Sequence, residues 1–134
     1  MSAARWIDFK TMTDGRGNLT VVESEVPFSI QRIYYLHGVP SGQQRGAHAH
    51  KELEQIAISV HGSLEVTIDD GKSSEKFVLD DPTKGLYIPK LVWRTLQNFS
   101  KGAVLLVLTS TRYSEEDYFR NREEYLEYLE FLNE

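Results

Sequence analysis

Short apolar runs separated by turn-forming residues dominate the first 112 positions of the chain. Residues 64–68 alternate apolar and polar side chains with a period of two and end at Asp69-Asp70-Gly71, which is typical of a strand entering a hairpin turn. Residues 103–109 are apolar up to their last position, which predicts a strand buried on both faces. Further strands are expected at residues 19–22, 28–36, 55–60, 77–79 and 86–88. Many short strands at this spacing predict an all-β sandwich or jelly-roll barrel.

The pattern changes after Tyr113. Ser114 is followed by three acidic residues, as at the N-terminus of a helix. Apolar side chains then recur at helical spacing, at Tyr118, Tyr125, Leu129 and Leu132. We therefore expect one helix over about residues 115–133, on the flank of a single β domain of residues 1–134. A chain of 134 residues suits one domain with one core.

The composition of the chain limits which molecules it is expected to bind and where it is expected to act. The formal net charge is -5 and no basic stripe is present, so a nucleic acid is not an expected partner. The chain has no cysteine, which excludes disulfides and thiol chemistry. The N-terminus carries no apolar run of signal-peptide length, and the apolar run at 103–108 is too short to span a bilayer. A cytoplasmic protein that does not bind membranes is the expected class.

Two of the four histidines lie within three residues, at His48 and His50. In a strand, residues two apart point to the same side, so both imidazoles are expected on one surface. Arg45 and Glu54 flank the pair, and the segment leads into an apolar strand, which favours a functional site over two surface histidines on a loop. His37 and His61 each precede a glycine at a strand end and are expected at the surface.

This spacing resembles the first motif of the cupin superfamily, which has a glycine, five residues, His-x-His, three or four residues and a glutamate. Gly42, His48, His50 and Glu54 fit it. The second cupin motif, Pro-x-Gly-x-x-His-x-x-x-Asn, is matched at both ends by Pro89 and Asn98. Together the two motifs imply a cupin jelly-roll β-barrel with a short C-terminal helix.

The second motif departs from the family at two positions, where Leu91 replaces the glycine and Arg94 replaces the histidine that binds metal in metal cupins. A guanidinium stays protonated and offers no lone pair, and its charge would repel a divalent cation. We therefore expect no metal. His48 and His50 are then free for acid–base chemistry near neutral pH.

Longer segments resemble the dTDP-4-keto-6-deoxyglucose 3,4-ketoisomerases, over nearly the whole chain. The segments are residues 27–35, 45–55, 85–88 with Trp93, and 116–118, and the Arg-Gly-x-His-Ala-His-Lys run is the most specific. The resemblance implies a metal-free homodimer that acts on a dTDP-linked keto-sugar. Its product would be used to make 3-amino-3,6-dideoxy sugars. These sugars occur in bacterial surface glycans, such as O-antigen or S-layer glycans, or in antibiotics. The reaction moves a ketone from C4 to C3 through an enediol and needs no redox cofactor.

The resemblance also suggests roles for individual side chains. His50 is the first choice as base at C3 and His48 as the partner that relays a proton to C4, although the two roles are interchangeable at this level. Tyr35 is a candidate to hydrogen-bond the enediolate, as an alternative to simple packing.

A diphosphate is expected to bind arginine forks. Arg16 and Arg45 are the candidates. Arg16 lies beside glycines in residues 14–19, a segment that resembles a motif of the sugar-nucleotide cupins, and Arg45 precedes Gly46 in the segment 45–55. Arg94 is expected to face the site. Glu54 is expected either to orient a histidine or to hold an arginine.

Three rival functions stay open. One is a dTDP-sugar 3,5-epimerase, which usually has one histidine in this segment. Another is a metal-dependent cupin oxygenase or isomerase, which Arg94 disfavours. The third is a non-catalytic cupin that binds a sugar nucleotide.

Overall fold

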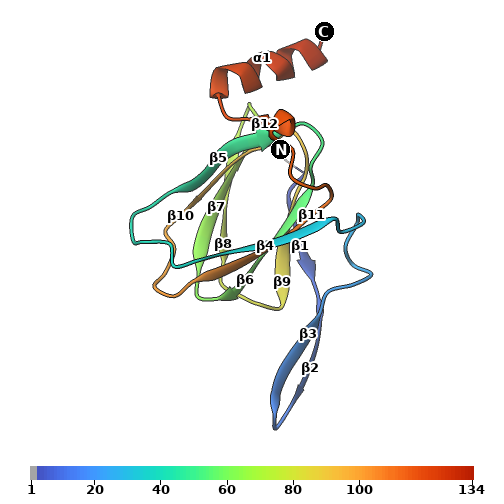
Figure 1. The fold of residues 1–134 in the computed structure, drawn as a ribbon, viewed down its shortest axis with the longest axis vertical. Helices are drawn as coiled ribbons and strands as arrows, with labels where there is room; N and C mark the ends of the chain where they lie inside the picture. The colour runs from blue at the N-terminus through green and yellow to red at the C-terminus, as the bar shows by residue number, and fades with distance from the viewer. Residues whose placement is uncertain (1–2) are drawn as a thin grey trace.

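Two antiparallel five-stranded sheets face each other in the computed structural model, which describes residues 3–134 (Figure 1). The first sheet has the order β1 (Arg5–Asp8), β9 (Lys84–Ile88), β6 (Gln55–His61), β11 (Val104–Thr109) and β4 (Arg32–His37). The second has the order β12 (Tyr118–Phe119), β5 (Arg45–His50), β10 (Trp93–Gln97), β7 (Leu64–Asp69) and β8 (Ser74–Leu79). A separate hairpin pairs β2 (Lys10–Asp14) with β3 (Gly17–Val21). This is the predicted all-β jelly roll, although hydrogen bonding leaves two facing sheets rather than one closed barrel.

The core lies between the two sheets. Along β7 the buried residues alternate with partly exposed ones, so Leu64, Val66 and Ile68 face inward. Leu105 and Val107 of β11 meet them from the other sheet in the same apolar cluster. The period of two in the sequence thus indicated correctly which face of β7 is buried.

The predicted strands are present with small differences at their ends. The largest is at residues 28–36, where β4 begins only at Arg32. Before that point, the backbone reaches β11 through the Gln31 N–H, which donates to the Thr109 carbonyl at 2.9 Å. The strand β11 lies between β6 and β4 and buries most of its length, as its apolar run predicts.

The predicted helix over residues 115–133 begins too early. Residues Glu115–Asp117 form one 3-10 turn, β12 follows, and α1 spans Arg122–Leu132. Its N-cap is Asn121, whose side chain accepts a hydrogen bond from the Glu124 N–H, whereas Ser114 makes no side-chain cap. The reason is long-range: Tyr118 and Phe119 pair with His50 and Ala49 of β5, and this pairing overrides the helical pattern.

The two ends of the molecule differ. Helix α1 covers the end where β12 and β5 meet, and the β2–β3 hairpin projects from the other end (Figure 1). Among residues 3–134, α1 and every other helical segment are too short or too polar to cross a bilayer.

Candidate active site

Strand β5 carries both histidines of the pair. His48 and His50 lie on one side of it, with ring centroids 4.8 Å apart, while Ala49 between them is fully buried beside Phe119 and Tyr125. The pair on a common face is therefore confirmed by the geometry. The ring of Tyr118, in the neighbouring β12, packs against both imidazoles. Its centroid lies 5.0 Å from that of His48 and 4.3 Å from that of His50.

A β-bulge sets the direction of β5 just before the histidines. Opposite it, Arg94 pairs with His48 and Thr95 with Gly46, so Ala47 is the extra residue. Ala47 has a φ of 58° and Gly46 a φ of 82°. A Cβ on Gly46 would lie 2.7 Å from Leu96 Cδ1, which can move, and 3.1 Å from the Arg94 carbonyl oxygen, so the positive φ and the nearby backbone together favour glycine. The bulge shifts the alternation, and both Arg45 and His48 therefore face the same cavity.

That cavity has a volume of about 690 Å³, which is within the usual range for a small-molecule site. His48 and Tyr118 lie in its wall, and His50 does not. Its remaining walls come from four segments of the chain: Arg32, Tyr34 and residues 36–40; residues 43–46; Leu96; and Arg120. Three arginines, at 32, 45 and 120, give it a positive charge suited to an anionic ligand.

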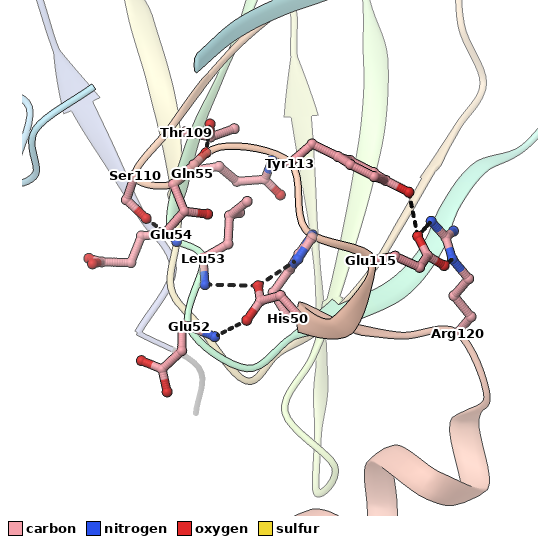
Figure 2. A network of polar contacts seen from close by, with 12 residues as sticks. His50, Glu52, Leu53, Glu54, Gln55, Thr109, Ser110, Tyr113, Glu115 and Arg120 are labelled. Carbon is pink, nitrogen blue, oxygen red and sulfur yellow. Dashed lines mark hydrogen bonds and ion pairs between the residues drawn. The ribbon is translucent and has the colours of Figure 1, made fainter. Parts of the chain in front are cut away.

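The two histidines differ in their access to solvent and in their partners. His50 is only 2% exposed, and its Nδ1 lies 3.2 Å from Oδ2 of Asp117 (Figure 2). His48 is partly exposed to the cavity. A ligand in the cavity therefore meets His48 first, with His50 behind it.

Arg94 lies inside the fold beside the histidines and is 1% exposed. Its guanidinium donates to Gln55 Oε1 and, at 3.1 Å, to the Val92 carbonyl. Within residues 3–134 it forms no ion pair with a carboxylate. Burial lowers the pKa of Arg94 to about 10, so the group stays protonated at neutral pH.

Burial, together with this cation, keeps both histidines neutral. Burial and the charge of Arg94 lower the pKa of His48 to about 4. The same two causes, with a smaller contribution from His48, lower the pKa of His50 to about 2. At neutral pH both imidazoles are therefore free to accept a proton, and Arg94 supplies a fixed positive charge next to them.

These lowered pKa values predict an acid-sensitive fold. In the unfolded chain a histidine binds a proton near pH 6.5, whereas in the folded chain His48 stays neutral down to about pH 4. The unfolded state therefore binds more protons in this window, and the free energy of unfolding falls as the pH drops below 6.5. We expect a loss on the order of 1–2 kcal/mol per buried histidine between pH 7 and pH 5. Urea titrations at the two pH values measure it.

The control for this prediction is the double variant His48→Asn/His50→Asn. Its stability should change much less between pH 7 and pH 5, because the carboxylates with lowered pKa values, such as Asp70, titrate well below this range. Equal pH dependence in the variant and the wild type would contradict the assignment to these histidines.

Only Arg45 and His48 of the residues proposed from the sequence line the cavity. His50 and Arg94 lie behind its wall, and the other three lie elsewhere. Tyr35 is 62% exposed on the outer face of β4, and the adjacent Tyr34 lines the cavity instead. The Arg16 side chain is 91% exposed at the tip of the hairpin and pairs with Asp14 at 2.6 Å. Glu54 accepts a hydrogen bond from the Tyr87 hydroxyl at 2.5 Å, and the next residue, Gln55, bonds the buried arginine.

Sequence reasoning missed two arginines of the cavity, Arg32 and Arg120. The guanidinium of Arg120 lies 4.2 Å from the centroid of the Tyr118 ring and is held by Glu115, with Nε to Oε1 at 2.6 Å (Figure 2). Arg32 stacks on the Tyr34 ring at 4.8 Å. His37, expected at the surface, is exposed but borders the cavity. The available signal for Arg32 was its position in the segment of residues 27–35, which resembles the 3,4-ketoisomerases.

The donor set does not fit the metal of other cupins. The cation Arg94 occupies the position of the fourth ligand, and the Glu54 carboxylate is turned toward Tyr87. In the part of the chain that the structure describes, no three His, Cys, Asp or Glu side chains are placed to hold a metal ion. Function without a metal stays a prediction from the chemistry of these residues.

Known proteins resemble the chain over almost its full length. The family profile described as FdtA (WxcM-like, C-terminal) matches residues 2–130. The TDP-4-oxo-6-deoxy-alpha-D-glucose-3,4-oxoisomerase of Aneurinibacillus thermoaerophilus is 40% identical over 129 residues, which cover 95% of this chain and 93% of that protein.

Solved structures agree with this result. A 3,4-ketoisomerase from Helicobacter canadensis superimposes with a TM-score of 0.94 at 42% identity, over 97% of this chain and 99% of that one. The 3,4-ketoisomerase QdtA from Thermoanaerobacterium thermosaccharolyticum was crystallised as a histidine-to-asparagine variant with TDP-4-keto-6-deoxyglucose. It gives a TM-score of 0.91 at 39% identity, over 93% of this chain and 92% of that one.

Proposed function

The chain belongs to the FdtA family of sugar-nucleotide 3,4-ketoisomerases, and from this premise we propose that it converts TDP-4-keto-6-deoxyglucose to the 3-keto isomer. The observation that carries the proposal is the pair of neutral histidines beside an arginine-lined cavity. A neutral imidazole is a base, and the arginines match a diphosphate. TDP itself is the ligand of a further solved QdtA structure.

The chemistry needs two proton transfers at carbon and one between the two oxygens. A base removes the proton from C3, which is acidic because the resulting negative charge spreads into the C4 carbonyl. The enediolate then receives a proton at C4, and the proton of the C3 hydroxyl passes to the oxygen at C4. The ketone thus moves from C4 to C3 with no net change in atoms or electrons. Arg94 lies behind the cavity wall, next to both histidines, and its proposed role is to stabilise the negative charge of the enediolate from there.

The accessibility of the two histidines favours one division of their roles. His48 lines the cavity, so we propose it as the base that removes the C3 proton. His50 lies behind it and, together with Tyr118, completes the proton path. This is the reverse of the first choice from the sequence, and the order in which a ligand meets the two rings supports it.

Incubation with TDP-4-keto-6-deoxyglucose tests the function directly. In NMR spectra, the signals of the 4-keto sugar should give way to those of a 3-keto sugar, without added metal or redox cofactor. A 3,5-epimerase would instead exchange the protons at C3 and C5 for solvent deuterium and leave the ketone at C4. Binding with neither conversion nor exchange would support the non-catalytic alternative.

Arg45 is proposed to bind the diphosphate, because it lines the cavity three residues before His48. We expect Arg45→Ala to weaken the binding of TDP about ten- to a hundredfold, since a hydrogen bond to a charged group contributes about 1.5–3 kcal/mol. Turnover at saturation should change less. Calorimetric titration with TDP measures the affinity. Arg112→Ala is the matched control, because Arg112 is exposed outside the cavity wall; equal losses in both variants would contradict a specific role.

A homodimer is the proposed assembly. The projecting hairpin exposes Met12 and Leu19, and the outer face of β4 exposes Ile33 and Tyr35, so apolar surface remains for a second copy. Sedimentation should give about twice the chain mass of 15.4 kDa. Leu19→Asp should shift the protein toward the monomer, and Val78→Asp, at an exposed valine of β8, should not. A monomeric wild type with full activity would contradict the proposal.

Other expected properties rest on the sequence alone. These are a cytoplasmic location, the lack of nucleic-acid partners, and a product destined for amino sugars of surface glycans. The role of Arg16 in binding substrate also stays a prediction, because within one chain this residue lies at the hairpin tip, away from the cavity wall.

A further inference from the structure

A single carboxylate, that of Asp117, connects the buried histidine to the backbone after β5. Oδ1 accepts the Glu52 N–H at 2.8 Å, and Oδ2 accepts the Leu53 N–H at 3.2 Å. Figure 2 draws these bonds as dashed lines from Glu52 and Leu53 to a carboxylate that carries no label. The same Oδ2 lies 3.2 Å from Nδ1 of His50. The Asp117 carbonyl in turn accepts the Lys51 N–H at 3.0 Å. The side chain of Asp117 is only 13% exposed, so its position is fixed from several directions.

These contacts favour one nitrogen of His50 as the position of its proton. An ionised carboxylate only accepts hydrogen bonds, so the ring must donate from Nδ1. Burial and the charge of Arg94 keep His50 neutral, and a neutral imidazole has one N–H. With that proton on Nδ1, Nε2 holds the lone pair. It is then the only ring nitrogen that can accept a proton and release it again.

We propose that Asp117 is a positioning residue that fixes His50 in the Nδ1–H tautomer, with Nε2 free for the proton path. Its effect on turnover rests on the proposed function, whereas the tautomer is a property of the protein without substrate. Asp117 contacts the histidine and the backbone and lies outside the wall of the cavity. It therefore acts through His50.

The tautomer can be measured directly in the wild type. Long-range ¹H–¹⁵N spectra separate a protonated from an unprotonated imidazole nitrogen, and loss of the His50 signals in His50→Asn assigns them. We expect Nδ1 protonated and Nε2 unprotonated at pH 7. A ring with its proton on Nε2 would overturn the proposal, whatever the activity of the protein.

Substitution tests the consequence for turnover. In Asp117→Asn an NH2 group, which can only donate, replaces one of the two accepting oxygens, so the network no longer fixes the Nδ1–H tautomer. We expect kcat to fall about ten- to a hundredfold, as for other partners that orient a functional histidine, with the affinity for TDP unchanged. Glu116→Gln is the control, because it makes the same chemical change at an exposed neighbour and should leave kcat unaltered.

A double-mutant cycle separates positioning from a purely structural role. If Asp117 acts through His50, adding Asp117→Asn to His50→Asn should cause little further loss of kcat. Losses that multiply, or a fall in TDP affinity matching the fall in kcat, would overturn the proposal in favour of a role in the fold of residues 51–54. A wild type with the expected tautomer but no ketoisomerase activity would contradict the proposed function and leave the tautomer assignment standing.

Discussion

Replacing His48 with asparagine is expected to lower kcat by at least about a hundredfold, within the usual range for a general base. Asparagine keeps a similar size and hydrogen-bonding capacity but has no lone pair basic enough to remove a carbon-bound proton at neutral pH. His48 lines the cavity, so its loss removes the base that the C3 proton meets first. The affinity for TDP should change little, because the arginines of the cavity remain.

Isotope exchange identifies the step that is lost. In D₂O the wild type should place solvent deuterium at C4 of the product and exchange C3 of recovered substrate. We expect His48→Asn to abolish the C3 exchange. His50→Asn should also slow product formation but retain measurable exchange at C3, because His48 still forms the enediolate. If exchange survives in His48→Asn and disappears in His50→Asn, His50 is the base and the division derived from accessibility is wrong.

The second large effect concerns Arg94. Arg94→Met should reduce kcat about a hundredfold or more, because a fixed charge next to a developing oxyanion contributes several kcal/mol to catalysis. It should also raise the pKa of His48 from about 4 toward 6.5, although burial, the larger cause, still keeps it lowered. NMR titration of His48 measures this shift, and steady-state kinetics measure kcat.

Stability should respond quite differently to the same substitution. Removing a buried charge that has no carboxylate partner among residues 3–134 relieves a desolvation cost of several kcal/mol. Leaving Gln55 Oε1 and the Val92 carbonyl without a donor costs about 1–3 kcal/mol each. These effects oppose each other, and we expect the free energy of unfolding to change by less than about 2 kcal/mol.

A matched control exists at Arg122, which pairs with Asp69 away from the cavity wall. Arg122→Met should leave both kcat and the pKa of His48 unchanged. A fully active Arg94→Met protein would show that Arg94 has no role in the reaction. A strongly destabilised one would show that Arg94 is needed for the fold.

Local sequence patterns were sufficient where the cause is local. Alternation of apolar and polar residues located β7 and its buried face. The turn after β7 was predictable from Asp69-Asp70-Gly71, because these residue types favour turns. In the structure Asp69 and Asp70 accept backbone N–H groups, and Gly71 adopts a φ of 92°. The spacing of His48 and His50 placed both rings on one face, since strand geometry alone fixes that relation.

Strand geometry alone could not predict whether Tyr34 or Tyr35 of β4 faces the cavity. The outer face of β4 also carries apolar side chains, Ile33 and Tyr35, so hydrophobicity could not distinguish Tyr34 from Tyr35. Strand β6 begins at Gln55 and is buried on both faces for most of its length, so it shows no alternation of polar and apolar residues. Without that alternation, the sequence could not indicate whether Glu54 or Gln55 would bond Arg94.

Other parts of the site depended on contacts between distant segments. The bulge at Ala47 exists only because β10 pairs with β5, and it brings Arg45 and His48, three positions apart, to one cavity. Pairing with β5 also makes a strand of Tyr118 and Phe119, where the helical pattern extends. That strand places Asp117 against His50, across 67 positions of sequence. Local patterns in the chain were enough to predict the strands and the common face of the histidines. Tertiary structure decided the surroundings of those histidines, because register, bulges and buried partners are set by long-range pairing that no local period encodes.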